Sequence, residues 1–210
     1  MKHLVIIGAG GFGREMFAAA TNARGYMESF DVKGFLDENP RALDGFADYP
    51  EIIGAPSTYA PQEGDVFITA LGNIASRRKC AAIIAEKGGE FISIVAKTAF
   101  IGTNVRIGKG SFIANNATLT ADITIGDHAC VFHSSSVGHD SVLGDFSHVY
   151  AQCSIGGAVR VGEGARIFPG AVVVPRRRIG RDSTVGAGST VLIDVEDGKT
   201  VFGSPAMEIA

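Results

Sequence analysis

Branched apolar residues recur at every sixth position through the second half of the chain. Period six matches neither the roughly 3.6-residue turn of an α-helix nor the two-residue alternation of a strand. It predicts short strands separated by tight turns, three strands to a coil, so that residues 18 apart stack between coils. The pattern therefore predicts a parallel β-helix over 95–191, built on Val95, Ile101, Ile107, Ile113, Leu119, Ile125, Val131, Val137, Leu143, Val149, Ile155, Val161, Ile167, Val173, Ile179, Val185 and Val191.

Two other positions of the six-residue unit, the hexad, are also restricted. Glycine often follows the branched residue, and because glycine tolerates the positive φ of sharp corners, we expect such a backbone there. The fourth position after the branched residue is mostly Ser or Ala and is expected to point inward. Arg177 occupies one of these small positions, which predicts a local distortion or a contact of Arg177 with another subunit. The glycines are Gly102, Gly108, Gly126, Gly138, Gly144, Gly156, Gly162, Gly180 and Gly186.

The first 92 residues have a different pattern. Apolar strands are expected at Lys2–Ile7, Val32–Leu36, Val66–Leu71 and Phe91–Ile94, with helices from Arg14 to about Ala23 and across 74–87. This alternation predicts an α/β, Rossmann-like βαβ domain with a parallel sheet. The expected organisation is therefore residues 1–92 as this domain, 93–193 as the β-helix, and 194–210 as a tail packed over the last coils.

Composition and charge narrow the class of protein. The net charge of −3 gives no electrostatic footprint for nucleic acid. The three cysteines form no CxxC pair, so neither a disulfide framework nor a thiolate zinc site is indicated. No apolar run approaches the ~20 residues that span a bilayer, and no leader precedes the first strand. We expect a soluble protein of the bacterial cytoplasm without membrane insertion.

The segment Gly8-Ala9-Gly10-Gly11-Phe12-Gly13 fits the pattern GxGxxG between a strand and a helix. Its amides and the helix N-terminus suit a phosphate or pyrophosphate. Asp37, 24 residues after Gly13, lies at a strand end, where an acid can bind a ribose hydroxyl or a base edge. A tight turn without ligand is the alternative. Because only about four strands precede the β-helix, a nucleotide bound through one βαβ half is favoured over NAD.

Four of the five histidines lie within 21 residues of the β-helix. His139-Asp140, followed by His148, is the group best suited to chemistry, because an imidazole beside a carboxylate can accept a proton from an attacking amine or hydroxyl. Polar corner residues without a function are the alternative. His128 and His133 are spaced like a zinc-binding pair, but Ile92 and Lys97 occupy the positions two coils earlier where a third ligand is needed. No metal is expected.

The hexads resemble those of the hexapeptide-repeat acyltransferases, which implies a left-handed β-helix, an exception to right-handed crossovers. Further motifs lie in Phe35-Leu36-Asp37-Glu38, Ala70-Leu71-Gly72-Asn73, Ser136-Val137-Gly138-His139-Asp140, Gly144-Asp145-Phe146-Ser147-His148-Val149, Gly186-Ala187-Gly188-Ser189 and Gly203-Ser204-Pro205-Ala206. With these motifs, nearly the whole chain is similar to the NeuD-type sialic acid O-acetyltransferase family, which includes N-acetyltransferases for nucleotide-linked 4-amino sugars.

This resemblance implies the following roles. His139 would be the general base polarised by Asp140, His148 would lie near the acyl group or the amine, and the Gly157 N–H would hold the oxyanion. The hexad register agrees, because Gly157 follows His139 by 18 residues, one coil. Acetyl-CoA, as co-substrate, would lie between subunits near Gly157, Ala187, Gly188, Gly203 and Pro205. The sugar nucleotide would contact Gly8, Gly10, Gly11, Phe12, Gly13, Asp37, Asn73 and His133.

Two departures from the family concern binding. The family often has Asn-Thr where this chain has Phe132-His133, which leaves the sugar undetermined. Met207 stands where Lys or Arg commonly follows the Pro-Ala of the tail. The basic contact with CoA that this removes is either lost or supplied by Arg176–Arg178, and the alternative for these arginines is a solvated corner.

The leading hypothesis is an acetyl-CoA-dependent N-acetyltransferase for a nucleotide-linked amino sugar of cell-surface polysaccharide synthesis. O-acetylation of a sugar or sialic acid hydroxyl would use the same residues. A non-catalytic nucleotide-binding scaffold and an NAD-dependent sugar-nucleotide oxidoreductase are the alternatives from other classes, although no Tyr-xxx-Lys pair supports the latter. The flat faces of a triangular prism predict a homotrimer with three clefts between subunits.

Overall fold

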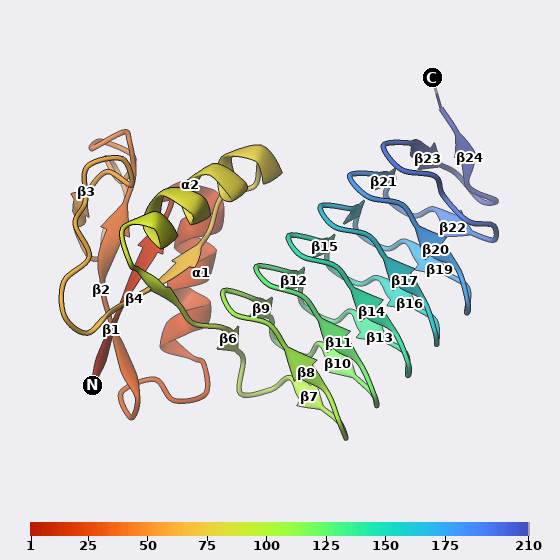
Figure 1. Cartoon of the computed structure of the whole chain (residues 1–210), viewed down its shortest axis with the longest axis horizontal. Helices are drawn as coiled ribbons and strands as arrows, with labels where there is room; N and C mark the ends of the chain where they lie inside the picture. The colour runs from red at the N-terminus through yellow and green to blue at the C-terminus, as the bar shows by residue number, and fades with distance from the viewer. Residues whose placement is uncertain (210) are drawn as a thin grey trace. The chain divides into compact units, whose positions relative to one another are not determined.

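The structure, a computed structural model, describes residues 1–209 of the chain. It forms two compact units, Met1–Ile94 and Val95–Ala210, drawn in red to yellow and in green to blue in Figure 1. Residue 210, the last of the expected tail, lies outside the described residues. Within 1–209, no helix has the length and apolarity needed to cross a bilayer.

The first unit is a parallel five-stranded sheet with two helices. The strand order is β3-β2-β1-β4-β5, and every pairing in it is parallel. The strands are β1 (Lys2–Ile7), β2 (Phe30–Leu36), β3 (Ile52–Gly54), β4 (Asp65–Thr69) and β5 (Glu90–Phe91), and the helices are α1 (Gly11–Thr21) and α2 (Ile74–Glu86). Leu4 to Ile7 on β1 are fully buried, as expected for a central strand with both faces covered.

Three boundaries in this unit differ from the sequence predictions. The helix α1 begins at Gly11 instead of Arg14, because Gly10 is its N-cap and the glycine loop already supplies the first turn. The strand β3 was not predicted, since three half-buried residues at a sheet edge give no apolar pattern. The expected strand Phe91–Ile94 is two strands: β5 ends at Phe91, and Ile94 opens the β-helix.

The second unit is the β-helix, whose two-residue strands form three parallel sheets, here called faces. Face 1 contains β6 (Ile94–Val95), β9 (Phe112–Ile113), β12 (Cys130–Val131), β15 (His148–Val149), β18 (Arg166–Ile167), β21 (Thr184–Val185), β23 (Thr200–Phe202) and, antiparallel, β24 (Met207–Glu208). Face 2 contains β7 (Phe100–Ile101), β10 (Thr118–Leu119), β13 (Ser136–Val137), β16 (Ser154–Ile155), β19 (Val172–Val173) and β22 (Thr190–Val191). Face 3 contains β8 (Arg106–Ile107), β11 (Thr124–Ile125), β14 (Val142–Leu143), β17 (Arg160–Val161) and β20 (Arg178–Ile179).

Residues 18 apart pair throughout these faces, as the hexad register predicts; Val137, for example, pairs with Leu119 and with Ile155. The coils stack along the axis in Figure 1. From Ile113 to Val191 every branched residue of the hexad is buried, while those of the first coil are partly buried. The fold class, a Rossmann-like α/β domain followed by a left-handed parallel β-helix, is confirmed.

The expectation about corner glycines was wrong. No glycine that directly follows a branched residue has positive φ. The left-handed residue lies two positions later and is usually not glycine, with φ between 52° and 63° at Asn104, Asn116, Asp122, His128, Ser134, Asp140, Phe146, Gln152, Ala158, Arg176 and Asp182. The glycines are required because of the next coil: a Cβ on Gly144 would lie 2.6 Å from the Glu163 nitrogen and 2.9 Å from the Gly162 carbonyl carbon.

The register through Arg177 is unbroken, since Arg160 pairs with Arg178 and Val161 with Ile179. The irregularity lies in the following coil, where Val195 pairs with Ile179 at a separation of 16 residues instead of 18. The shortened coil places Asp194 beside Arg177, with 3.7 Å between Oδ1 and the guanidinium. The distortion expected at Arg177 is therefore displaced by one coil.

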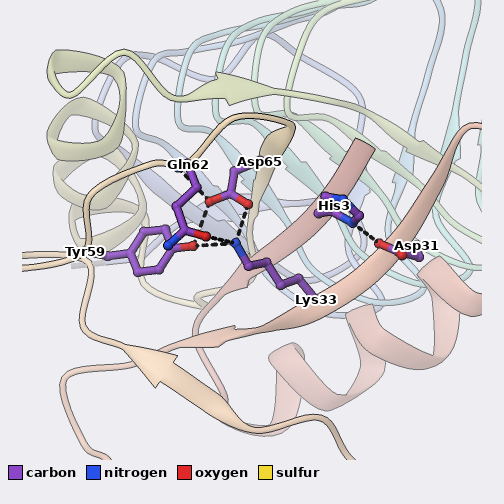
Figure 2. A network of polar contacts seen from close by, with 6 residues as sticks. All are labelled: His3, Asp31, Lys33, Tyr59, Gln62 and Asp65. Carbon is purple, nitrogen blue, oxygen red and sulfur yellow. Dashed lines mark hydrogen bonds and ion pairs between the residues drawn. The ribbon is translucent and has the colours of Figure 1, made fainter. Parts of the chain in front are cut away.

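A buried polar network joins β2, β4 and the loop between β3 and β4 (Figure 2). Lys33 Nζ donates to Asp65 Oδ1 at 2.7 Å, to Gln62 Oε1 at 2.8 Å and to Tyr59 Oη at 3.1 Å. Asp65 Oδ2 accepts from Tyr59 Oη at 2.6 Å and from the Gln62 N–H at 2.9 Å. The side chain of Asp65 is 0% exposed, so its charge depends on these partners.

The network shifts the titration of its members. Burial alone would raise the pKa of Asp65, but the hydrogen bonds from Lys33, Tyr59 and the Gln62 amide hold it below its usual value. Burial would likewise lower the pKa of Lys33, and the hydrogen bond to Asp65 raises it instead. Because the folded pKa of Asp65 is depressed, its stabilising contribution is present above the unfolded pKa and is lost as the pH falls through the folded value.

A methyl group at Gly144 should destabilise the β-helix. We expect Gly144→Ala to lower the free energy of unfolding by about 1–3 kcal/mol, because the two coils must separate locally to admit the Cβ. The matched control is Gly198→Asn, at a left-handed glycine (φ 71°) with no atom within 4 Å of an added Cβ, which should cost much less. Urea denaturation followed by far-UV circular dichroism measures both. Equal losses in the two variants would contradict the stacking argument.

Removing the Lys33 ammonium should leave the buried Asp65 carboxylate without its cation. We expect Lys33→Met to lower the free energy of unfolding by about 2–3 kcal/mol at pH 7, and the difference from wild type to narrow below about pH 4 as Asp65 becomes protonated. The control is Lys2→Met at the exposed Lys2–Glu90 pair (3.4 Å), where a loss below about 0.5 kcal/mol is expected. A difference that is independent of pH would count against the network.

Candidate active site

His139 and Asp140 occupy the corner between β13 and β14. His139 Nδ1 and Asp140 Oδ2 are 2.7 Å apart, and their side chains are 68% and 62% exposed. Asp140 is the left-handed residue of this corner (φ 61°), so its side chain follows that of His139 around the turn. With Nδ1–H donated to the carboxylate, a neutral His139 presents the lone pair of Nε2 to solvent. The pair is thus arranged to accept a proton at Nε2.

Gly157 lies one coil above His139, at the corner between β16 and β17. The backbone joins the two corners, since the Ala158 N–H donates to the His139 carbonyl at 2.7 Å. A Cβ on Gly157 would lie 2.7 Å from His139 Nε2, so the missing side chain gives the imidazole its place. The predicted stacking of Gly157 on His139 is what the structure has.

The Gly157 N–H donates no hydrogen bond within residues 1–209. Elsewhere the equivalent corner amides are used: those of Lys109 and Asp127 donate to Asp127 and Asp145 of the following coil, and that of Arg181 donates to Asp197. No aspartate follows in the column of Gly157, where Pro175 comes next. A polar hydrogen and a proton acceptor therefore lie together at this corner.

His148 lies on β15 in face 1, away from the corner between faces 2 and 3 that carries His139. It is 1% exposed, and its Nδ1 is 3.4 Å from Tyr150 Oη, with the Phe132 ring 5.9 Å away. Within one chain the structure does not bring His148 to His139. The predicted neighbourhood of the two histidines would need a second copy of the chain.

The other histidines of the β-helix are also separate from His139. His133 is exposed at the corner between β12 and β13, and its carbonyl accepts from the Gln152 N–H at 3.0 Å. His128 is buried and stacks on Phe146 with ring centroids 4.7 Å apart. Over the described part of the chain, no group of three His, Cys, Asp or Glu side chains is arranged to hold a metal ion.

The residues expected to bind CoA form a second cluster. Ala187 and Gly188 are exposed at the corner between β21 and β22. The tail packs against the same corner: the Gly203 N–H donates to Ser189 Oγ at 3.0 Å, and the Ala206 N–H donates to the Thr190 carbonyl at 2.8 Å. This cluster lies between faces 1 and 2, whereas His139 and Gly157 lie between faces 2 and 3.

The basic run 176–178 is partly neutralised. Arg178 pairs with Asp197 at 2.6 Å, and Arg177 lies beside Asp194. Arg176 is exposed and stands in the same column as Asp140, two coils further along. Of the three arginines, Arg176 is the one directed into solvent above the corner of His139.

In the first unit, a cavity of about 240 Å³ lies at the carboxyl ends of β1 and β2. This end of a parallel sheet is where α/β domains bind ligands. Gly8 and Asp37 line the cavity, as the sequence predicted. The remaining lining was not predicted: Ile7, Leu36, Glu38, Pro56 and Leu71, together with Ser76, Lys79, Cys80 and Ile83 from one stripe of α2. Their spacing of i, i+3, i+4 and i+7 was the available signal for that stripe.

The glycine loop is held by Asp37. Asp37 Oδ2 accepts from the Ala9 N–H at 2.8 Å, and its Oδ1 accepts from the Asn39 N–H at 2.9 Å. Gly8 has φ 104°, and a Cβ on Gly13 would collide with the Gly8 carbonyl, so both glycines are needed for the turn itself. Gly10 and Gly11 are exposed at the start of α1, with Phe12 half-buried.

Asn73 has a structural partner. It is the N-cap of α2, and its Oδ1 accepts from the Ser76 N–H at 2.9 Å. Ser76 in turn lines the cavity, so Asn73 acts on the cavity through the helix that it caps.

Cys80 lies half-buried in the lining of the cavity. Burial, together with the charge of Glu38, raises the pKa of its thiol, and Lys79 opposes this. The other cysteines, Cys130 and Cys153, are buried in the β-helix. Cys80 is therefore the most accessible thiol of the three.

Two family models match the chain. Residues 3–84 match the PglD N-terminal domain, and residues 90–189 match the GMPPB C-terminal domain. No curated protein gave a significant match.

Solved structures are similar over the full length. A His-to-Asn mutant of perosamine N-acetyltransferase from Caulobacter crescentus, in complex with CoA and GDP-perosamine, is 27% identical with a TM-score of 0.89, covering 100% of this chain and 98% of that one. WeeI from Acinetobacter baumannii is 25% identical with a TM-score of 0.70, covering 100% of both chains. The acetyltransferase domain of PglB from Neisseria gonorrhoeae, in complex with acetyl coenzyme A, is 24% identical with a TM-score of 0.59 over 99% of each chain and shares the fold.

The resemblance stated from the sequence is thereby confirmed. An N-terminal domain of the PglD type, a hexapeptide β-helix and similarity along the whole chain occur together here. The chain belongs to the hexapeptide-repeat nucleotide-sugar acetyltransferases.

Proposed function

We propose that this protein is an acetyl-CoA-dependent N-acetyltransferase that acts on the amino group of a nucleotide-linked sugar. The observation that carries the proposal is the His139–Asp140 pair with the Gly157 N–H beside its Nε2. Support comes from the full-length similarity to perosamine N-acetyltransferase, whose structure holds CoA and GDP-perosamine. The acyl donor is a co-substrate, and the proposed chemistry needs no metal.

The proposed reaction begins with the amine of the sugar, which must be neutral to attack. Its nitrogen forms a bond to the thioester carbonyl carbon while His139 Nε2 takes the proton that the nitrogen loses. Asp140 accepts the hydrogen bond from Nδ1 and stabilises the imidazolium that forms. The carbon–sulfur bond then breaks, releasing CoA as a thiolate, and the products are the amide and CoA.

Negative charge develops on the carbonyl oxygen during this attack. The Gly157 N–H has no acceptor among the described residues and lies on the side of the corner where Nε2 points. A donor placed in advance at a developing oxyanion is often worth about 3 kcal/mol of transition-state stabilisation. Gly157 would therefore contribute to the chemical step as the oxyanion donor.

The nucleotide part of the acceptor is assigned to the first unit. The cavity at the ends of β1 and β2, with Gly8 and Asp37 in its lining, has room for a nucleobase or ribose. The exposed glycines at the start of α1 suit the phosphates. In this proposal Asp37 shapes the loop while it also faces the ligand.

The CoA cluster and the catalytic corner belong to different edges of one prism. A homotrimer with a three-fold axis parallel to the prism would place the edge of Ala187 and Gly188 from one subunit near the edge of His139 from the next. His148, on face 1, would reach the same cleft from the neighbour. We therefore propose three active sites, each shared by two subunits, in a cytoplasmic enzyme.

Activity should depend on both substrates and on His139. We expect thiol release from acetyl-CoA with at least one nucleotide-linked amino sugar, and His139→Asn should lower kcat by about 10²–10⁴-fold because the general base is lost. His3→Asn in the first unit is the control and should keep wild-type activity. Mass spectrometry of the product separates N- from O-acetylation. No thiol release with any amino sugar, or full activity of His139→Asn, would refute the proposal.

Shared sites should allow two inactive variants to complement each other. His139→Asn removes the base, and Gly188→Asp places a negative charge where CoA phosphates are expected. Co-expressed in equal amounts, they should recover about a quarter of wild-type activity, since one cleft in four pairs an intact His139 with an intact neighbouring Gly188. Light scattering should give the mass of a trimer. A monomer, or no recovery in the mixture, would exclude the shared cleft.

A further inference from the structure

The cavity of the first unit has one wall that belongs to no helix or strand. Pro56 in this wall comes from the loop between β3 and β4, while the rest of the lining comes from strand ends and α2. The loop makes a turn of its own, with the N–H groups of Thr58 and Tyr59 donating to the Ala55 carbonyl at 3.1 and 2.9 Å. Residues 55–59 are called the wall turn below. Its position decides the width of the cavity.

Lys87 holds the wall turn from the end of α2. As the C-cap residue of that helix, it donates from Nζ to the carbonyls of Pro56 at 3.0 Å, Ser57 at 2.7 Å and Tyr59 at 3.0 Å. An ammonium has three N–H donors, so this geometry uses all of them. Such hydrogen bonds from a charged donor are stronger than neutral ones. The long lysine side chain gives up its rotamer freedom for a contact with one short turn.

Glu38 holds the same turn from the end of β2. Its Oε2 accepts from Ser57 Oγ at 3.1 Å, and its Oε1 accepts from the Ser57 N–H at 3.3 Å. Glu38 follows Asp37, which holds the glycine loop through the Ala9 amide. Two adjacent carboxylates therefore fix opposite parts of the same site, the phosphate-type loop and the wall turn.

The far end of the wall turn is fixed by the buried network of Figure 2. Tyr59 Oη donates to Asp65 at 2.6 Å and accepts from Lys33 at 3.1 Å. This anchor lies at the base of the loop and is needed for stability. Lys87 and Glu38 are exposed, and such contacts add little to global stability. Their effect is local and falls on the cavity.

We propose that Lys87 and Glu38 are positioning residues for the nucleotide, which hold the wall turn so that the cavity is formed before the substrate binds. This inference rests on the proposed function for the identity of the ligand. A preformed wall removes the cost of ordering the turn on binding, so it should strengthen binding of the nucleotide sugar and leave binding of acetyl-CoA unchanged. Neither residue touches the reacting atoms.

The first experiment reads the wall turn without catalysis. Cys80 in the cavity is alkylated with iodoacetamide at fixed alkaline pH, and the labelled peptides are resolved by mass spectrometry from those of buried Cys130 and Cys153. Lys87→Met and Glu38→Gln should each raise the rate at Cys80 roughly fivefold, because the turn opens more often. The control Lys2→Met, at an exposed ion pair in the same unit, should leave the rate unchanged. An unchanged rate in Lys87→Met would overturn the proposal.

The second experiment separates the two substrates. In Lys87→Met and in Glu38→Gln, KM for the nucleotide sugar should rise about tenfold, while kcat and KM for acetyl-CoA stay within about twofold of wild type. The double variant should fall short of the product of the two effects, because both residues hold one turn. Equal rises in both KM values would overturn the proposal.

The two hypotheses fail in different ways. Protection of wild-type Cys80 by GDP or UDP tests whether the cavity takes a nucleotide at all, and its absence would count against the proposed function. Faster labelling of Cys80 in the variants tests the positioning role, whether or not a nucleotide binds.

Discussion

The structure of the β-helix depends on one distance, the close spacing of parallel strands in successive coils, about 4.8 Å. Every hexad must meet it three ways. The branched residue fills the interior column, the next residue often has to be glycine because a Cβ would enter the backbone of the neighbouring coil, and the third residue turns the corner with positive φ. Where the chain shortens after Val191, the regular pairing of the 18-residue register ends with it.

The same spacing produces the candidate active site. A histidine at a corner lies against the corner of the next coil, and only glycine at position 157 leaves room for the imidazole ring of His139. The corner amides outside the coil-to-coil ladder supply donors that stay available wherever no aspartate follows in the column. General base and oxyanion donor thus come from one repeated geometry, and only the residue types distinguish this corner from the others.

The first unit solves a different problem, that of forming a cavity at the edge of a small sheet. Its glycine loop owes its shape to backbone contacts and to Asp37, which leaves the amides at the start of α1 exposed. The opposite side of the cavity comes from a turn that charged side chains hold from two directions. Cavity and catalytic corner therefore rest on different physics: preorganised loops in one unit and coil stacking in the other.

The sequence by itself determined the repeat, its register, the burial of the branched and small positions, and the stacking of Gly157 on His139, because a strict period converts sequence separation directly into position. It also placed β1, β2, β4 and both helices of the first unit. Only the tertiary structure decided that His148 and the CoA cluster lie away from His139, that the corner glycines serve close approach instead of positive φ, and that α2 lines the cavity. These depend on which face or corner a residue occupies and on contacts between segments far apart in the chain, which no local pattern encodes.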